Sequence, residues 1–488
     1  MRILAKHPIK RLIALIVAML LCCGGLFPAL AALPEAAQGL DRYEIDIVMD
    51  AARAVLACTQ RVRYTNRSQD TLNNLYFHAY PNAFKREYTS PAADPELSAY
   101  PRGFDPGEIA FSGVWVEGEA VAFALQGIDE AVLRVPVGLL APGQEVALEF
   151  AYTLRVPLAH YRFGRSEGDV WNLGNAFPIA AMYEYGEWRL DPYVSIGDPF
   201  YSACADYRVT VDLPRGFEVA ASGAPREREE AGGRTRWAFE IAGAREFALC
   251  FGKGFRVESA VADGVLVQAY ATSGGRARRA LQYAQSALRT YAELFGPYPH
   301  PSFSVAEAAL GGLGNMEYPG LAMIDLVQLE RSGALEFEMA HVVAHQWWYA
   351  QVGSDQVRSP WLDEALAEYS ALLYYERAHG QEAFDRLYEQ RVESAMRITL
   401  PSDRTIGAEI GRFASRWEYK MVVYQRGAGM LHGLRLALGE EVFLRALRAY
   451  LEAHRFGIAT RPDLVRAFNE AGGSNWQGYF DDYLDGAF

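Results

Sequence analysis

The chain has 488 residues, of which 51% are hydrophobic and 22% are charged. This composition is typical of a globular protein with two or three domains, and it excludes a disordered chain. The formal net charge of −13 and the pI near 5.3 argue against nucleic acid or an anionic membrane as a partner, because both repel an acidic surface.

The N-terminus has the pattern of an export signal. Lys6 and Lys10 precede an apolar run over residues 12–30, and Ala29-Leu30-Ala31 offers the small residues that signal peptidase requires. Residues 1–31 are therefore predicted to be a signal peptide, and the mature chain to be exported, periplasmic or extracellular. Retention as a membrane anchor is the alternative, because the run is about long enough to span a bilayer.

Three cysteines remain after the predicted signal, at Cys58, Cys204 and Cys250. This number is odd and too small for a disulfide framework. At most one bridge can form, and the sequence leaves its pairing open.

Residues 32–255 have the pattern of a β-rich domain. Apolar and polar residues alternate in 43–48, 146–152, 207–213 and 237–241, and turns rich in Gly, Pro and Asp separate these segments. Such alternation gives each strand one buried face and one solvent face. We expect this domain to form a large antiparallel sandwich or saddle.

The pattern changes after Gly254. A strand is predicted at 265–271, followed by a helix over 276–295 that Gly296 and Pro297 end. Long helical segments are then predicted at 334–352, 361–379 and 418–438. The fold class is therefore α+β, with the β-rich domain followed by a mainly helical domain over 256–488.

Three residues of the helical domain have the spacing of zinc ligands. His341 and His345 are four positions apart in a segment with helical periodicity, so both imidazoles can reach one metal ion. Glu364 follows nineteen positions after His345 in a second helical segment and can supply a carboxylate. Three protein ligands and an open fourth position are typical of catalytic zinc sites. Glu368, one helical turn further, is a candidate to support them.

These segments resemble the aminopeptidase N family of metallopeptidases, which are gluzincins with a thermolysin-like catalytic domain. The family pattern is His-Glu-x-x-His, eighteen residues and Glu, and this chain has His341-Val-Val-Ala-His345 and Glu364 at that spacing. Gly314-Asn-Met-Glu is similar to the family's exopeptidase motif Gly-x-Met-Glu, and Tyr424-Gln-Arg-Gly is similar to its Tyr-x-Lys-Gly segment. The resemblance covers about residues 256–455 and extends more loosely to the β-rich domain.

The resemblance implies one zinc ion per chain on the two histidines and Glu364, and peptides with a free N-terminus as substrates or ligands. Glu317 would bind the peptide α-amine, with Gly314 and Met316 as neighbouring substrate-binding residues. Tyr424 would act in catalysis by donating a hydrogen bond to the oxyanion. The residues alone also allow a solvated turn carboxylate for Glu317 and a core tyrosine for Tyr424.

The departure from the family pattern that matters most lies directly after the first His, and a smaller one is Tyr318, where the exopeptidase motif usually continues with Asn. The family's general base is the Glu directly after the first His, and this chain has Val342 there. A valine can neither accept nor return a proton, a task that contributes about 10²- to 10⁴-fold to catalysis. Glu338 lies on the same helical face but one turn back, so it would need an intervening water. We expect zinc binding to survive and hydrolysis to be weak.

Three explanations of Val342 are open. The protein is a pseudopeptidase that binds zinc and peptide N-termini without turnover, or it is a slow enzyme. The third explanation is that the valine is a mutation or a sequencing error, because Glu and Val codons differ by one base. A peptide-binding scaffold and a purely structural domain without metal are the alternatives from other functional classes. Turnover separates the enzyme from the binding protein, and metal content separates both from the structural domain.

Overall fold

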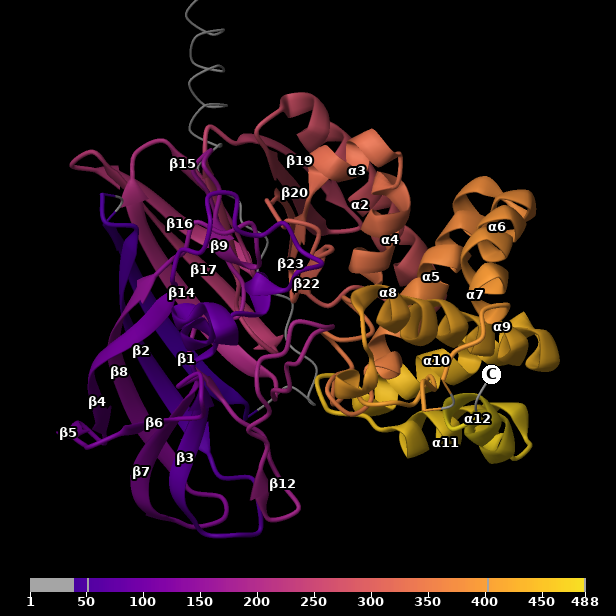
Figure 1. Ribbon diagram of the computed structural model, residues 1–488, viewed down its shortest axis with the longest axis horizontal. Coiled ribbons are helices and arrows are strands. Elements are labelled where there is room, and N and C mark those ends of the chain that lie inside the picture. Colours follow the sequence, from indigo (N-terminus) through magenta and orange to yellow (C-terminus); the bar gives the residue numbers. More distant parts are fainter. Residues whose placement is uncertain (1–38, 51, 402, 487–488) are drawn as a thin grey trace, which may run out of the picture. The chain divides into compact units, whose positions relative to one another are not determined.

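The computed structural model describes residues 39–486 apart from positions 51 and 402 (Figure 1). The expected signal peptide, residues 1–31, lies outside the described residues. Within the described part of the chain, no helix combines the length and the apolar character that crossing a membrane requires. Cys58, Cys204 and Cys250 are buried free thiols.

The N-terminal domain is built on an eight-stranded sheet with the order β16-β17-β14-β1-β2-β8-β4-β5. Its strands are β1 (Asp41–Asp50), β2 (Val55–Thr65), β4 (Glu108–Val116), β5 (Glu119–Ala120), β8 (Glu145–Arg155), β14 (Ala205–Pro214), β16 (Ala224–Ala231) and β17 (Arg234–Ala244). The four segments predicted from alternation lie in β1, β8, β14 and β17. Neighbouring strands pair antiparallel, as expected, except that β1 pairs in parallel with β14.

Two four-stranded sheets and one hairpin complete this domain, in the orders β15-β18-β10-β9, β11-β3-β7-β6 and β12-β13. Their strands are β3 (Leu72–His78), β6 (Ala124–Gln126), β7 (Val132–Leu140), β9 (Phe163–Arg165), β10 (Val170–Leu173), β11 (Ile179–Ala180), β12 (Tyr183–Glu184), β13 (Glu187–Trp188), β15 (Phe217–Ala221) and β18 (Leu249–Lys253). Short 3₁₀ turns follow β3 at Tyr80–Lys85, Glu87–Thr89 and Pro91–Ala93. Tyr43, Ile45 and Ile47 of β1 are buried in the core that the sheets share, which explains why alternation predicted strands here.

The C-terminal domain begins with a five-stranded mixed sheet in the order β19-β20-β21-β23-β22. The strands are β19 (Arg256–Ala262), β20 (Val265–Ala271), β21 (Ser302–Glu307), β22 (Met316–Tyr318) and β23 (Leu321–Ile324). Only β20 was predicted from the sequence. The sheet matters for the site because β22, which carries Glu317, is its edge strand.

Helices make up the rest of the C-terminal domain, coloured from rose-red through orange to yellow in Figure 1. They are α2 (Gly274–Phe295), α3 (Leu326–Ser332), α4 (Leu335–Ala344), α5 (Trp361–His379), α6 (Gln381–Tyr388), α7 (Ser394–Met396), α8 (Arg416–Tyr419), α9 (Gly427–Leu438), α10 (Glu440–His454), α11 (Arg461–Gly472) and α12 (Gln477–Leu484), with a 3₁₀ turn at Ile410–Arg412 and π-helical turns at Glu389–Glu393 and Lys420–Arg426. The predicted helix over 361–379 is confirmed with both of its ends.

Two predicted helices are wrong in extent. The segment 334–352 is helical only to Ala344, and the following residues form tight turns in which Tyr349 has a φ of 149°. Trp347 and Trp348 are fully buried in those turns. Because residues 339–352 are all buried, their periodicity does not distinguish a buried helix from a buried turn. The segment 418–438 is interrupted by the π-helical turn, so regular helix starts only at α9.

Arg245 and Glu246, which follow β17, connect the N-terminal domain to the turns after α4. The Arg245 guanidinium donates to the carbonyl of Tyr349 at 2.6 Å, and the hydroxyl of Tyr349 donates to the Glu246 carboxylate. Asn175 donates a further hydrogen bond of 2.5 Å to Glu246. Burial raises the pKa of Glu246 to about 7, against the lowering effect of the hydrogen bond from Tyr349.

We expect Glu246 to make the protein less stable as the pH rises. Between about pH 4.5 and 7 the unfolded chain releases this proton while the folded chain keeps it, so the free energy of unfolding falls by at most about 3 kcal/mol and then levels off. Urea unfolding at pH 5 and pH 8 measures the total loss, and Glu246→Gln should make that loss smaller by the share that Glu246 contributes. The exposed Glu229→Gln is the control. An equal pH dependence in Glu246→Gln and the wild type would contradict the assignment.

Candidate metal centre and peptide cleft

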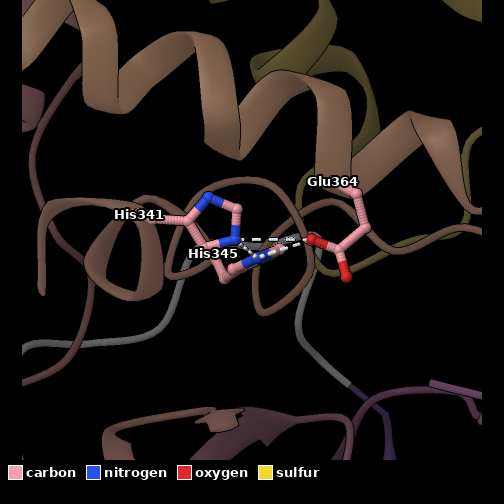
Figure 2. A group of neighbouring side chains, drawn as sticks. All are labelled: His341, His345 and Glu364. Atoms are coloured by element: carbon pink, nitrogen blue, oxygen red, sulfur yellow. Dashed lines mark hydrogen bonds and ion pairs between the residues drawn. The ribbon is translucent and has the colours of Figure 1, made fainter. Parts of the chain in front are cut away.

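The two histidines meet the carboxylate of Glu364 where α4 ends beside the first turn of α5 (Figure 2). The Nε2 atoms of His341 and His345 are 3.2 Å apart, and each lies 3.4 Å from Oε2 of Glu364. All three side chains are buried. The structure therefore brings together the three residues that the sequence predicted as ligands.

The spacing of these atoms fits a tetrahedral metal ion. Zinc bonds of about 2.0–2.1 Å at tetrahedral angles separate neighbouring ligand atoms by about 3.3 Å. Oε2 of Glu364 makes no hydrogen bond within the described residues, although it is buried and both imidazoles are near. Two imidazole nitrogens and one carboxylate oxygen are also the donor types that zinc prefers. The residues present thus fit the ion.

The charges of the three groups are coupled. Burial raises the pKa of Glu364, but the two imidazoles outweigh that effect and lower it to about 2. For His345, burial lowers the pKa, while Glu317 and Glu364 raise it to about 10. A carboxylate that stays ionised between two imidazoles provides the negative charge that a buried cation requires.

Further contacts orient the two imidazoles. Oε2 of Glu368 lies 3.3 Å from Nδ1 of His341, and Nε of Arg391 donates to Oε1 of Glu368 at 2.7 Å. Nδ1 of His345 lies 3.0 Å from the carbonyl of Trp348. Acceptors beside both Nδ1 atoms favour protons there and leave the Nε2 lone pairs for a metal. Arg391 was missed by sequence reasoning because its segment contains no metal-ligand pattern.

Tyr424 lies in the π-helical turn Lys420–Arg426 and faces the same centre. Its hydroxyl donates to Oε1 of Glu364 at 2.5 Å, and its ring stacks on His341 with centroids 5.5 Å apart and planes at 13°. π-Helical turns are frequent at functional sites because they redirect a side chain within a helix. The structure thus places the phenol beside the ligand triad.

Glu317 is a buried strand residue rather than a solvated turn residue. Its side chain on β22 is 9% exposed and makes no hydrogen bond or ion pair within the described residues. Burial raises the pKa of this carboxyl to about 8. Met316 is buried beside it, and Gly314 has a φ of 113°, which favours glycine.

His341, Glu317 and Tyr424 line one cleft of about 250 Å³. Four carboxylates contribute to its wall: Asp198, Glu317, Glu338 and Glu364. Val342 lines the cleft next to His341 and is 1% exposed. Glu338 accepts a hydrogen bond of 3.3 Å from Asn315 and lies 3.7 Å from the Lys420 ammonium. Asp198 was missed by sequence reasoning because it comes from the N-terminal domain.

Comparisons with known proteins show which family this chain is similar to. The family model described as the peptidase family M1 domain matches residues 279–483. Aminopeptidase M1 of Arabidopsis thaliana is 26% identical over 290 residues, which are 56% of this chain and 33% of that protein. Aminopeptidase N of Lactococcus lactis subsp. lactis is 23% identical over 432 residues, 81% of this chain and 48% of that protein. The chain therefore spans half or less of these relatives.

Solved structures share the fold over nearly the whole chain. The M1 zinc metallopeptidase from Deinococcus radiodurans has a TM-score of 0.64 at 18% identity, covering 94% of this chain and 96% of that one. A mutant of that protein bound to a Tyr-Ser-Ala substrate also has a TM-score of 0.64, at 19% identity and 92% and 94% coverage. The predicted fold class, a β-rich domain followed by a thermolysin-like helical domain, is confirmed.

We expect Glu368→Gln to weaken zinc binding about 10- to 100-fold, because the neutral amide no longer presents a negative charge 3.3 Å from Nδ1 of His341. Competition with a chromogenic chelator measures the affinity. Glu376→Gln is the matched control, since Glu376 lies on the same helix and pairs with Arg435 instead. Equal zinc affinities in the two variants would contradict this assignment.

Proposed function

We propose that this chain, whose residues 279–483 match the peptidase M1 domain, is an aminopeptidase N-type zinc metallopeptidase by descent that binds zinc and captures peptides by their free N-terminus. Hydrolysis by this site is slow, because Val342 stands where the family has its general base. The alternative is a pseudopeptidase without turnover.

The observation that carries the proposal is the buried, unpaired carboxylate of Glu317 beside the ligand triad. One of its oxygens lies within 4.8 Å of a Glu364 oxygen. Without a cationic partner this carboxyl favours its neutral form, since burial raises its pKa to about 8, and a cation that joins it stabilises the ionised form. A peptide α-ammonium supplies that cation, and because it belongs to the same residue as the reacting carbonyl, its capture selects the N-terminal peptide bond.

The remaining residues divide the chemistry among them. A zinc ion on His341, His345 and Glu364 would polarise the scissile carbonyl as a Lewis acid. The Tyr424 hydroxyl, now donating to Glu364, is placed to donate instead to negative charge that develops on the substrate oxygen.

Proton transfer is the step that this cleft supports least. Val342 has no group that accepts a proton, and its side chain is packed against the cleft wall. Among the cleft carboxylates, Glu338 is engaged by Asn315 and Lys420. The second candidate function is a slow enzyme in which Glu338 moves the proton through an intervening water. The position of Glu338 in the wall of the same cleft favours it.

Export forms part of the proposal. The pattern of residues 1–31 would place the cleft outside the cytoplasm, where it meets extracytoplasmic peptides. N-terminal sequencing of the mature protein tests this directly, because cleavage after Ala31 starts the chain at Ala32. An intact N-terminus in the membrane fraction would favour the anchor instead.

We expect Val342→Glu to raise turnover of aminoacyl amides by about 10²- to 10⁴-fold while both proteins hold about one zinc ion. Zinc is measured by mass spectrometry and turnover by release of the free amine. Val342→Gln is the matched control, because it has nearly the size of glutamate but takes up no proton. If the wild type already cleaves at the rate of Val342→Glu, another group moves the proton and the account of Val342 is wrong.

We expect Glu317→Gln to retain zinc and to lose most of its preference for free over acetylated peptide N-termini. The reason is that the amide keeps the shape of the side chain but not the charge that faces the ammonium. Calorimetric titration with Leu-Gly-Gly and N-acetyl-Leu-Gly-Gly measures the preference. A preference equal to that of the wild type would place the amine site elsewhere.

A further inference from the structure

We infer that a groove beside the cleft binds the distal part of long peptides, from about the sixth residue onward. This inference rests on the proposed function and deepens it, because it makes long peptides the preferred ligands. The groove measures about 930 Å³. Its walls come from Glu96, Ser98 and His160 of the N-terminal domain and from residues 307–312 and α3 of the C-terminal domain. We call it the distal groove.

The distal groove lies at the carboxyl ends of three parallel strands. Thr272 directly follows β20, Glu307 ends β21 and Asp325 directly follows β23, and all three residues line the groove. This edge is where α/β sheets commonly bind ligands. The buried carboxylate of Glu307 is paired with Arg276 at 2.7 Å, so this part of the wall is satisfied without a bound cation.

The cleft and the distal groove share a rim. Gly312 lines both, and it is exposed with no atom within 4 Å of the position that a Cβ would take. Asn315 of the cleft accepts a hydrogen bond of 3.3 Å from the backbone N–H of Asp325 in the groove. A peptide main chain can therefore pass over Gly312 from one hollow into the other.

The edge strand β22 sets the direction and the length of that path. Residues 312–317 all line the cleft, whereas Tyr318 is 3% exposed and does not. An extended peptide can lie beside an edge strand such as β22. With its amine at Glu317, the peptide extends toward Gly312, which is five residues earlier and at most about 17 Å away. It reaches the shared rim at about its sixth residue.

The loop between β21 and β22 offers hydrogen-bond donors to such a peptide. The backbone N–H groups of residues 309–312 make no hydrogen bond with any described residue, and all four residues line the distal groove. A peptide presents one carbonyl acceptor per residue whatever its sequence. The ligand class is therefore a polypeptide main chain, recognised by length more than by side chains.

The test is a calorimetric titration of the zinc-loaded protein with three peptide amides: Leu-Gly-Gly, Leu-Gly-Gly-Ala-Ser and Leu-Gly-Gly-Ala-Ser-Ala-Ser-Ala. We expect the first two to bind within about twofold of each other, because both end before the groove. The octapeptide should bind about tenfold more tightly, since one or two added hydrogen bonds supply that factor. The N-acetyl forms of the tripeptide and the octapeptide should lose the same factor.

Two variants obstruct the distal groove from opposite walls. Gln328→Trp adds an indole on α3 and Ser98→Trp adds one on the N-terminal domain; both positions are exposed and neither side chain bonds a described residue. Each should bind the tripeptide like the wild type and lose the gain of the octapeptide. Glu330→Trp is the matched control, because Glu330 lies on the same helix but faces Arg279 instead of the groove.

The outcomes separate this inference from the proposed function. If all three peptides bind the wild type equally while acetylation still weakens binding, the inference fails and the proposed function stands. If acetylation has no effect but the octapeptide gain is present and both obstructing variants remove it, the groove binds peptides and the proposed capture of the N-terminus fails. An octapeptide gain that survives in both variants would place the distal residues elsewhere. Should a variant unfold, the length series on the wild type still decides.

Discussion

The close approach of two imidazoles and one carboxylate at the end of α4 is the constraint on which the rest of the site depends. Two nitrogens 3.2 Å apart, each 3.4 Å from the same buried carboxylate oxygen, are stable only with a cation or protons among them. The surrounding structure holds this arrangement firmly. The hydroxyl of Tyr291 on α2 donates to the carbonyl of Ala340 on α4, and the indole of Trp348 donates to Ser370 on α5. Packing of three helices thus fixes the ligand atoms before any metal arrives.

The N-terminal domain contributes to the same centre rather than only covering it. Arg245 donates a hydrogen bond to the carbonyl of Tyr349, four residues after His345. A residue of the N-terminal domain therefore holds the turn that follows α4. Arg162 and Asp198 form a buried ion pair in that domain, and both residues line the cleft. Buried ion pairs of this kind add little net stability but are strongly destabilising when one partner is lost. We infer that these contacts mainly fix how the N-terminal domain packs against the C-terminal domain at the cleft.

The sequence predicted those parts of the site that obey a local period. The ligand triad followed from the four-residue spacing of the two histidines, an acid on the next helix and the resemblance to the family pattern, and the full extent of α5 followed from its helical period. The edge strand β22 was not predicted, since three residues in a glycine-rich segment have no detectable period. Asp198 and Arg391 were also missed. Their proximity to the centre arises from tertiary packing between distant segments, for which a single sequence contains no signal.

A valine at position 342 is compatible with the other proposed site residues because those residues lie on separate elements. The metal ligands depend on the packing of α4 against α5, and the amine-facing carboxylate depends on β22. A general base at position 342 would be a fifth carboxylate in a cleft that is already lined by four, and like charges at short range raise the cost of each. Valine removes that repulsion and packs as an apolar residue, so the change costs the site its proton acceptor without weakening the groups that hold a metal and an ammonium. We therefore propose that the cleft suits binding better than rapid turnover.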